Sequence, residues 1–320
     1  MTADTHPHVD EAAFSELAER YRPEMRVHCY RMLGSFEESE DAVQETLLRA
    51  WRRRETFEGR STFRAWLYRI ATNACLDALG RRERSLQVAS GPEVPWLQPF
   101  PDRLLEELPA HDEDPDAAVV AKETIELAFM AAIQHLPPRQ RAVLILRDVL
   151  GWPAKDTAGL LDASVASVNS ALQRARAALK RHLPERRLEW APGADASEEE
   201  QALLERYLNA TEEADAEAFV EMMREDARFS MPPEPGLWVG RRTVVDSWSD
   251  AFDTESFGRV RGVVTRANMQ PAVACYLKRP GENMYRPMAL DVIRIEERRI
   301  AEIVTFPPQV FPAFALPDEL

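Results

Sequence analysis

The sequence predicts a multidomain protein in which two all-α domains precede a C-terminal α+β domain. Apolar residues recur at helical spacing over residues 12–84 and again over 117–183, whereas β-type runs appear only after residue 226. Helices followed by a group of strands are typical of α+β folds or of separate domains. The 320 residues allow two or three domains, and the 45% hydrophobic content is enough for packed cores.

The first helical domain is predicted over residues 12–84. Its opening apolar positions have helical spacing, at Phe14, Leu17, Tyr21, Met25 and Cys29. A turn at Gly34-Ser35 precedes a helix over 39–54. A second turn precedes a helix over 62–82, whose N-terminus Ser61 or Thr62 is placed to cap.

Two linkers separate the predicted domains. Residues 85–116 are acidic and contain six prolines, so we expect an extended linker with one short helix over 102–108. Residues 184–197 form a second, shorter linker.

The second helical domain, residues 117–183, is predicted to hold four helices, over 119–134, 137–149, 154–161 and 165–181. The last two are joined by Asp162-Ala163-Ser164, which gives the short connection of a helix-turn-helix. Small side chains early in the second of these helices favour a close approach to a DNA major groove. The alternative is an ordinary αα-hairpin.

The C-terminal domain, residues 198–316, begins with two helices, over 198–210 and 216–223, and has a further helix over 243–252. Its strands are predicted over 227–231, 260–268, 272–277, 288–295 and 299–305. We expect them to form a mostly antiparallel sheet.

The net charge of −14 is unevenly distributed along the chain. Residues 137–187 carry ten Lys and Arg against four acids, whereas residues 196–320 carry 23 acids against 14 bases. Because salt screens exposed charges beyond about 10 Å, a polyanion meets the local basic surface rather than the total charge.

Cysteine spacing and hydropathy exclude several classes of protein. Cys29, Cys75 and Cys275 lie far apart and have no histidine at zinc-ligand spacing, so we expect buried thiols, no metal and no cofactor. The longest apolar runs are too short to span a bilayer, and the polar N-terminus is not a signal peptide. These features predict a cytoplasmic protein with no membrane partner.

The predicted helix-turn-helix carries the first candidate site. Ser164 is placed to cap the second helix, and the polar side chains that follow are suited to base edges and phosphates. These reader residues are Ser164, Ser167, Asn169, Ser170, Gln173, Arg174 and Arg176.

The first helical domain carries two further candidate sites. Asp41, Gln44, Glu45 and Leu48 lie on adjoining helical faces whose mixed polarity suits a protein–protein interface. A loop with two aromatics around a polar turn suits the capture of an unstacked base, and a polar helical face follows it. The loop residues are Phe57, Arg60, Ser61, Thr62 and Phe63, and the face holds Asn73, Asp77, Arg81 and Arg82.

Two sequence segments in each helical domain resemble the motifs of a known family. Asp-Ala-Val-Gln-Glu-Thr-Leu-Leu-Arg-Ala-Trp (41–51) and Phe-Arg-Ala-Trp-Leu-Tyr-Arg-Ile-Ala-Thr-Asn (63–73) resemble region 2 of extracytoplasmic-function (ECF) sigma factors of the sigma-70 family. Leu-Pro-Pro-Arg-Gln-Arg-Ala-Val-Leu-Ile-Leu-Arg (136–147) and Ala-Ser-Val-Asn-Ser-Ala-Leu-Gln-Arg-Ala-Arg (166–176) resemble region 4. The resemblance spans about residues 12–183.

This resemblance implies a promoter-directed transcription initiation factor that is not an enzyme. Its implied partners are promoter DNA and core RNA polymerase, through the clamp helices and flap of the large subunits. Asp41, Gln44, Glu45 and Leu48 match the surface that binds the clamp helices. The aromatic loop and the polar face match the residues that capture the minus-ten strand, and the reader residues match the helix that reads the minus-thirty-five element. Ala166 and Ser170 depart from the family, in which basic residues are common at these positions.

The linker and the C-terminal domain extend the resemblance. Trp-Leu-Gln-Pro-Phe-Pro-Asp (96–102) is similar to an inserted motif of SigG-type, SigJ-like ECF factors, and packing of 96–105 on a folded domain is expected. The acidic residues of 112–116 either occupy a basic channel of the polymerase or form a solvated linker. Residues 198–316 resemble the SnoaL-like branch of the NTF2-like fold, a cone of helices against a curved sheet, most clearly over 232–241.

All six histidines precede this domain, and no carboxylate pair or nucleophile–base arrangement is evident in it. We therefore expect regulation in cis or ligand sensing rather than catalysis. The candidate ligand pocket holds Trp238, Trp248, Tyr276 and Asp291, with plain packing or surface positions as the alternative. The apolar tail 306–316 is expected to dock onto the sigma domains. A DNA-binding enzyme and a conventional repressor are the alternative functions, and the repressor leaves residues 41–84 unexplained.

Overall fold

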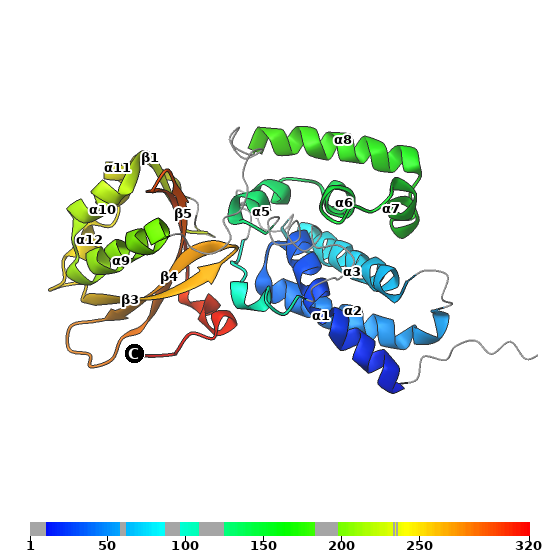
Figure 1. The fold of residues 1–320 in the computed structure, drawn as a ribbon, viewed down its shortest axis with the longest axis horizontal. Coiled ribbons are helices and arrows are strands. Elements are labelled where there is room, and N and C mark those ends of the chain that lie inside the picture. Colours follow the sequence, from blue (N-terminus) through cyan, green and yellow to red (C-terminus); the bar gives the residue numbers. More distant parts are fainter. Residues whose placement is uncertain are drawn as a thin grey trace, which may run out of the picture. The chain divides into compact units, whose positions relative to one another are not determined.

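The structure, a computed structural model, describes residues 11–57, 62–86, 97–108, 125–182, 198–232, 234 and 236–320. The chain divides into two compact units. The helical unit comprises residues 1–93 and 104–189, and the C-terminal unit comprises residues 94–103 and 190–320. Figure 1 labels the elements of both.

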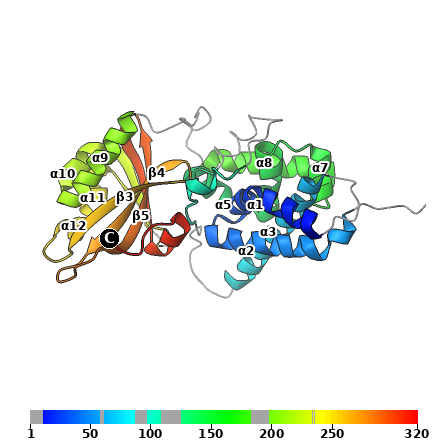
Figure 2. The same cartoon turned by 60° about the horizontal axis from the view of Figure 1, so that its bottom comes forward.

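The first part of the helical unit is a three-helix arrangement of α1 (Glu11–Leu33), α2 (Phe36–Arg52) and α3 (Phe63–Leu86), with the short 3-10 turn η1 (Arg54–Thr56) after α2. The helices pack against one another, as Figures 1 and 2 show. α2 begins three residues earlier than predicted, because Ser35 caps it by accepting a hydrogen bond from the Glu38 amide. α3 continues to Leu86, beyond the predicted end of the first domain.

The second part of the helical unit holds α5 (Leu127–Gln134), α6 (Pro138–Leu144), the π-helical segment η3 (Ile145–Val149), α7 (Ala154–Leu160) and α8 (Val165–His182). Pro138 occupies the first turn of α6, where its missing amide hydrogen costs no helical hydrogen bond. α7 and α8 form the predicted helix-turn-helix, with Asp162 in the left-handed conformation at the turn (φ 49°). The four predicted helices are thus present, although the first is described only from Leu127.

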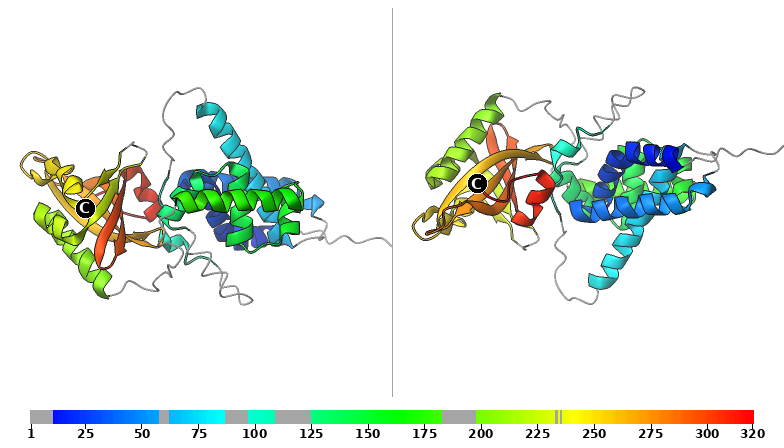
Figure 3. Two further views of the ribbon diagram at one scale, coloured as in Figure 1. Left: turned by 90° about the horizontal axis from the view of Figure 1, so that it is seen from above. Right: turned by 90° about the horizontal axis from the view of Figure 1, so that it is seen from below.

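The C-terminal unit is a six-stranded curved sheet with helices against one face. The strand order is β2-β1-β6-β5-β4-β3, and all neighbours are antiparallel except β1 and β6. Figure 3 shows the sheet between the helices on one side and the C-terminal segment η5, drawn in red, on the other. The strands are β1 (Met223–Ser230), β2 (Trp238–Val239), β3 (Arg259–Ala267), β4 (Gln270–Lys278), β5 (Arg286–Glu296) and β6 (Arg299–Phe306).

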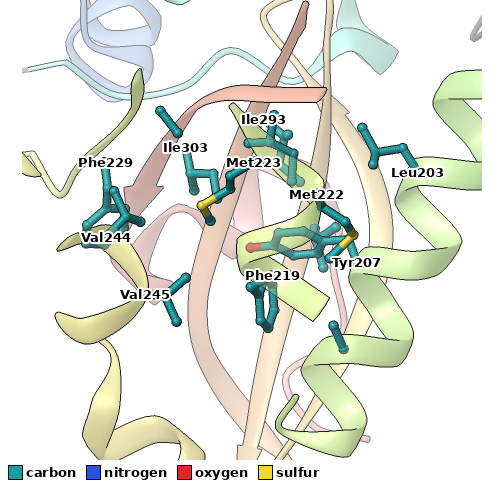
Figure 4. Packing of buried hydrophobic residues seen from close by; sticks show 14 of the residues in the cluster. Leu203, Tyr207, Phe219, Met222, Met223, Phe229, Val244, Val245, Ile293 and Ile303 are labelled. Atoms are coloured by element: carbon teal, nitrogen blue, oxygen red, sulfur yellow. The ribbon is translucent and has the colours of Figure 1, made fainter. Parts of the chain in front are cut away.

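The remaining elements of this unit are α9 (Glu198–Glu213), α10 (Ala216–Met222), α11 (Arg241–Asp246), α12 (Ser249–Phe252) and the 3-10 segment η5 (Pro308–Phe314). The single helix predicted over 243–252 is therefore two short helices, and the short strand β2 was not predicted. The main core lies between the helices and the sheet. Figure 4 shows Tyr207, Phe219, Met222 and Ile293 meeting there.

Residues 97–103, which lie within the predicted linker, are assigned to the C-terminal unit. The Phe100 amide donates to the Asn268 side chain (2.7 Å), and the Asn268 amide donates to the Phe100 carbonyl (2.9 Å). Phe100 is fully buried, and Pro101 forms a bridge with Ala267. Packing on a folded domain, as expected for this stretch, explains why an apolar motif occurs within an acidic linker. The short helix predicted over 102–108 is only the 3-10 turn η2 (Asp102–Leu104).

Asn268 and Met269 form the tight turn between β3 and β4, and both have positive φ, 54° and 61°. This conformation is unfavourable for methionine. The linker segment supports the turn, since the Met269 amide donates to the Asp102 carboxylate at 2.9 Å. Residues 184–197 and the acidic residues 112–116 lie outside the described residues.

Candidate functional site

The second helix of the helix-turn-helix, α8, presents its polar residues to solvent. All seven reader residues are exposed, whereas Val168, Leu172 and Ala175 on the same helix are buried. The Ser164 hydroxyl accepts a hydrogen bond from the Ser167 amide at 3.1 Å, which is the predicted cap. The helix therefore presents the reader residues on its exposed face, together with Val165, which is 43% exposed, and Ala166.

Three of the bases counted in this segment are engaged within the protein. Arg176 forms a two-point ion pair with Asp148, at 2.7 and 2.8 Å. Arg147 donates to the Trp152 carbonyl, and Arg141 is buried. These contacts were not predictable, because the partners are distant in sequence or are backbone groups.

Arg141 connects α6 to α1 inside the helical unit. Its guanidinium donates to the carbonyl of Met32 (2.5 Å) and to the side-chain oxygen of Gln134 (2.6 Å). It also donates to three further carbonyls, those of Ile133, Gln134 and Leu136. Burial lowers the pKa of Arg141 to about 10, so the side chain stays charged at neutral pH. Gly34 (φ 74°) lies beside this contact, and a β-carbon there would approach Gln134 to 2.8 Å.

The predicted interface on α2 is exposed. Asp41 and Gln44 face solvent, Leu48 is 43% exposed, and Glu45 is half-buried. Arg49 donates to Glu45 at 2.6 Å and to Asp77 on α3 at 2.7 Å, so one cation joins the α2 interface to the polar face of α3. The hydrogen bonds to Asp77 and Glu45 raise the pKa of Arg49. Arg49 was not among the predicted site residues, although arginine four residues after glutamate on a helix is a recognisable ion-pair spacing.

The polar face of α3 is accessible along its length. Asp77 and Arg81 are exposed, and Asn73 and Arg82 are half-buried. Arg82 also lies 3.8 Å from Glu38 of α2. The face therefore carries both signs of charge, and two of its members are already paired with α2.

The aromatic loop is only partly described, because Arg60 and Ser61 lie outside the described residues. Phe57 and Phe63 contact each other edge to face at 5.7 Å, and Trp66 contacts both. All three rings are half-buried, and Thr62 is exposed. The rings therefore form an accessible aromatic cluster at the start of α3.

A groove of about 650 Å³ lies between the start of α3 and α7. Tyr68 contacts Trp152 edge to face at 5.3 Å, and Arg69 pairs with Asp162 at 3.0 Å, so the two halves of the helical unit meet beside this groove. Trp66 also lines the groove. Arg64, Arg69 and Lys155 give the groove a basic lining with one acid, Asp156.

The C-terminal unit contains a cavity of about 490 Å³ between the helices and the sheet, which we call the cone cavity. Trp248 and Asp291 line it, as predicted. Asp291 accepts hydrogen bonds from Thr305 (2.5 Å), Tyr207 (2.9 Å) and Cys275 (3.3 Å). Burial raises the pKa of the Asp291 carboxyl, and the three donors act in the opposite direction.

Tyr276 and Trp238, the other two predicted pocket residues, do not line the cone cavity. Side chains alternate along a strand, so Tyr276 faces away from its neighbour Cys275, contacts Phe311 of η5 and donates to the Pro317 carbonyl at 2.9 Å. Trp238 lies on β2 and packs against Phe229 at 5.3 Å. The donors that surround Asp291 were missed, although Thr305 is its cross-strand partner on β6.

Among the described residues, no group of three or more His, Cys, Asp or Glu side chains is arranged to hold a metal ion. No described helix combines the length and the apolar character needed to cross a membrane. Cys29, Cys75 and Cys275 are buried free thiols.

Comparisons with known proteins match all three parts of the chain. Family models for sigma-70 region 2, sigma-70 region 4 and the SnoaL-like domain match residues 17–85, 126–179 and 204–303. The chain is 42% identical over 324 residues to the ECF RNA polymerase sigma factor SigG of Mycobacterium tuberculosis, covering 96% of this chain and 85% of SigG. It is 29% identical over 174 residues to SigW of Bacillus subtilis, covering 54% of this chain and 90% of SigW.

A solved structure has the same overall architecture. The crystal structure of the M. tuberculosis ECF sigma factor SigJ matches 95% of this chain and 99% of its own, with a TM-score of 0.61 and 22% sequence identity. That likeness concerns the fold, whereas the identity to SigG along nearly the whole chain concerns the family. The chain therefore belongs to the ECF sigma factors of RNA polymerase, with sigma-70 regions 2 and 4 followed by a SnoaL-like domain.

Proposed function

We propose that this sigma factor recruits core RNA polymerase through α2 and recognises two promoter elements through α3 and α8, and that its C-terminal unit modulates this activity in cis. The observation that carries the proposal is the exposure of all seven reader residues of α8 on a chain that also presents the region 2 surfaces. A partner of this kind implies a cytoplasmic location.

We assign the minus-thirty-five element to α8. The seven exposed reader residues hold amide, hydroxyl and guanidinium groups, which are the groups that read base edges and hold phosphates. Asn169 and Gln173 carry side chains suited to two-point contact with adenine. Arg174 is exposed with the other reader residues and is suited to a phosphate or a guanine.

We assign the minus-ten strand to the aromatic cluster and the polar face of α3. Phe57, Phe63 and Trp66 provide accessible rings on which an unstacked base is stabilised by about 1–3 kcal/mol. Arg81 and Arg82 follow along the same helix and supply positive charge for the strand backbone.

We assign the polymerase contact to Asp41, Gln44, Glu45 and Leu48. An apolar side chain that is 43% exposed among polar neighbours is typical of an interface core with a polar rim. Since Arg49 pairs with both Glu45 and Asp77, polymerase binding and strand capture use surfaces joined by one side chain.

Modulation in cis is supported by the position of residues 97–103. This segment separates regions 2 and 4 in the sequence, yet it is bonded to the β3–β4 turn of the C-terminal unit. A change in that unit therefore acts on the connection between the two DNA-binding regions. We propose regulation rather than catalysis for this domain.

The recruitment proposal is tested by transcription with purified core polymerase on promoters selected from a random DNA library. Leu48→Arg places a charge in the proposed interface core and is expected to reduce core binding at least tenfold, with unchanged melting. Glu16→Arg, which places the same new charge at an exposed position of α1 outside the proposed surfaces, is the control. Absence of initiation by the unmodified protein, or normal core binding by Leu48→Arg, contradicts the proposal.

Modulation in cis is tested by Phe100→Ala in the full-length chain, which removes the buried ring that holds the linker segment. We expect promoter-directed output to change several-fold relative to the unmodified protein. Val264→Ala, at a position 48% exposed on β3, is the matched control. Unchanged output with a released linker, measured by proteolysis at 97–103, contradicts modulation through this segment and leaves the recruitment proposal intact.

A further inference from the structure

Aromatic side chains that contact one another edge to face wall the cone cavity. Phe219 contacts Tyr207 at 5.1 Å and Trp248 at 5.5 Å, and Trp248 contacts Phe229 at 5.0 Å. Figure 4 shows Tyr207 and Phe219 directed from their helices towards the sheet. A volume of about 490 Å³ is within the range of small-molecule sites, and rings packed in this way form a preformed apolar wall.

One carboxyl group is fixed at the sheet side of this cavity. Thr305 donates to one oxygen of Asp291, and Tyr207 and Cys275 donate to the other. These three donors come from β6, α9 and β4, so they hold the carboxyl in one orientation. Asp291 nevertheless is half-buried as a residue and lines the cavity, so its side chain forms part of the wall that an occupant meets.

The charge of the lining excludes anions. The described residues that line the cavity include the acids Asp291, Glu234 and Asp250 but no lysine, arginine or histidine. An anionic ligand would lose its hydration without gaining a cationic partner, and it would meet acids instead. The occupant is therefore uncharged or cationic.

The hydrogen bonding at Asp291 favours a hydroxyl on the occupant. A hydroxyl group donates to an ionised carboxylate and accepts from a protonated carboxyl, so it is satisfied in either protonation state. Three donors already occupy most of the accepting positions of the carboxyl, which leaves room for one small group.

We propose that the cone cavity binds a mainly apolar ring compound without negative charge, whose rings lie against Phe219 and Trp248 and whose hydroxyl meets Asp291. The inference goes beyond promoter recognition, because binding is measured without polymerase or DNA. A failure of either proposal is therefore distinguishable from a failure of the other.

Three matched probes test the proposal with the full-length protein: 1-pyrenemethanol, pyrene and 1-pyrenecarboxylate. Binding is followed by equilibrium dialysis and by quenching of tryptophan fluorescence. We expect 1-pyrenemethanol to bind several-fold more tightly than pyrene, because only the former has the hydroxyl. We expect 1-pyrenecarboxylate to bind at least tenfold more weakly than 1-pyrenemethanol.

Asp291→Ala is a variant that we expect to bind one of the probes, 1-pyrenecarboxylate, more tightly. Removal of the carboxyl frees the Tyr207, Thr305 and Cys275 donors and removes one negative charge. The preference for 1-pyrenemethanol over pyrene should disappear, while the affinity for 1-pyrenecarboxylate should rise. A gain in affinity for one probe does not arise from misfolding. Asp318→Asn, at an exposed position outside the cavity, is the control and should leave all three affinities unchanged.

Ala251→Trp keeps the proposal falsifiable if Asp291→Ala does not fold. Ala251 lines the cavity from α12, and the larger side chain should weaken all three probes by filling the space. The proposal is overturned if 1-pyrenemethanol does not bind, or if it binds no more tightly than pyrene. Equal binding of 1-pyrenecarboxylate, or a hydroxyl preference that persists in Asp291→Ala, also overturns it.

Discussion

The two units of this protein differ in where their candidate binding groups lie. The helical unit has its reader residues on the exposed face of α8 and buries a cation, Arg141. The C-terminal unit has a carboxyl group, Asp291, in its interior beside a cavity. An exposed helical face suits a large partner such as duplex DNA, whereas an interior group suits a small one.

Arg141 and Asp291 also differ in how completely the protein satisfies their hydrogen bonding. Arg141 donates to five oxygens, four of them backbone carbonyls, and is 4% exposed. Asp291 accepts from three side chains and still faces the cone cavity. A charged group whose hydrogen bonds are all made within the protein stabilises the fold. A charged group that can still form a hydrogen bond is available to a ligand.

The largest expected effect is on stability and follows from the loss of the Arg141 hydrogen bonds. Arg141→Met removes the guanidinium and leaves four backbone carbonyls and the Gln134 side chain short of donors. We expect the helical unit to lose about 3 kcal/mol or more of unfolding free energy. Denaturant unfolding followed by circular dichroism measures this, and the transition of the C-terminal unit should not move.

Arg139→Met is the matched control, because Arg139 is exposed and lies two residues away on α6. It should change the stability by less than about 0.5 kcal/mol. A comparable loss in both variants would show that charge in this segment, rather than the bonding of Arg141, stabilises the unit.

The fold of the helical unit was largely predictable, because helix periodicity and cap residues are local properties. The exposed positions of α8 followed from its spacing, and Ser164 caps it as expected. The role of Arg141 was not predictable, since its partners are mainly backbone carbonyls brought together by the packing of α6 on α1. It was counted with the exposed bases for that reason.

The second prediction concerns the exposed face. Asn169→Ala removes an amide suited to base readout, and we expect a loss of about 1–3 kcal/mol in discrimination at one position of the minus-thirty-five element. Competition binding with single-base variants of a selected promoter measures it. Lys180→Gln, on an exposed residue of the same helix, should instead weaken all sequences alike. Uniform weakening by Asn169→Ala would assign that residue to the phosphate backbone.

The cone cavity was less predictable than the reader helix. Asp291 was named as a polar candidate on a predicted strand of the cone, but its three donors come from three other elements of the fold. The error for Tyr276 has a simple cause: one residue along a strand reverses the face, and the sequence did not show which face of β4 is covered by helices. Here η5 covers the other face.

The third prediction compares how the stability of each unit changes as the pH falls. Burial lowers the pKa of His28 from 6.5 to about 3, so the unfolded chain binds a proton that the folded unit does not bind. Stability from His28 is therefore present above pH 6.5 and falls below it, by at most about 1.4 kcal/mol per pH unit. The raised pKa of Asp291 has the opposite sign, because its burial cost disappears on protonation and the C-terminal unit gains stability as pH falls.

Thermal unfolding between pH 7 and 4.5 measures this contrast. The transition of the helical unit should move down with acid more steeply than that of the C-terminal unit, whose sequence contains no histidine. His28→Gln should flatten the response of the helical unit. An unchanged slope in His28→Gln would assign the acid sensitivity to other groups.

The smallest expected effect concerns the one reader residue that is already paired. Asp148 holds Arg176 through two hydrogen bonds, so the guanidinium of Arg176 is held against the end of η3 although the side chain stays exposed. Asp148→Asn should free Arg176 for a phosphate and steepen the dependence of log affinity on log salt concentration by about 0.9, the value for one phosphate. Asp156→Asn, on an exposed residue of α7, removes the same charge without touching this pair. If Asp156→Asn steepens the slope equally, the effect is one of net charge. If only Asp148→Asn does so, the availability of Arg176 to DNA is set by its ion pair with Asp148. Hydrogen bonds within the protein would then limit what the exposed Arg176 can bind, as they limit what Asp291 can bind in the C-terminal unit.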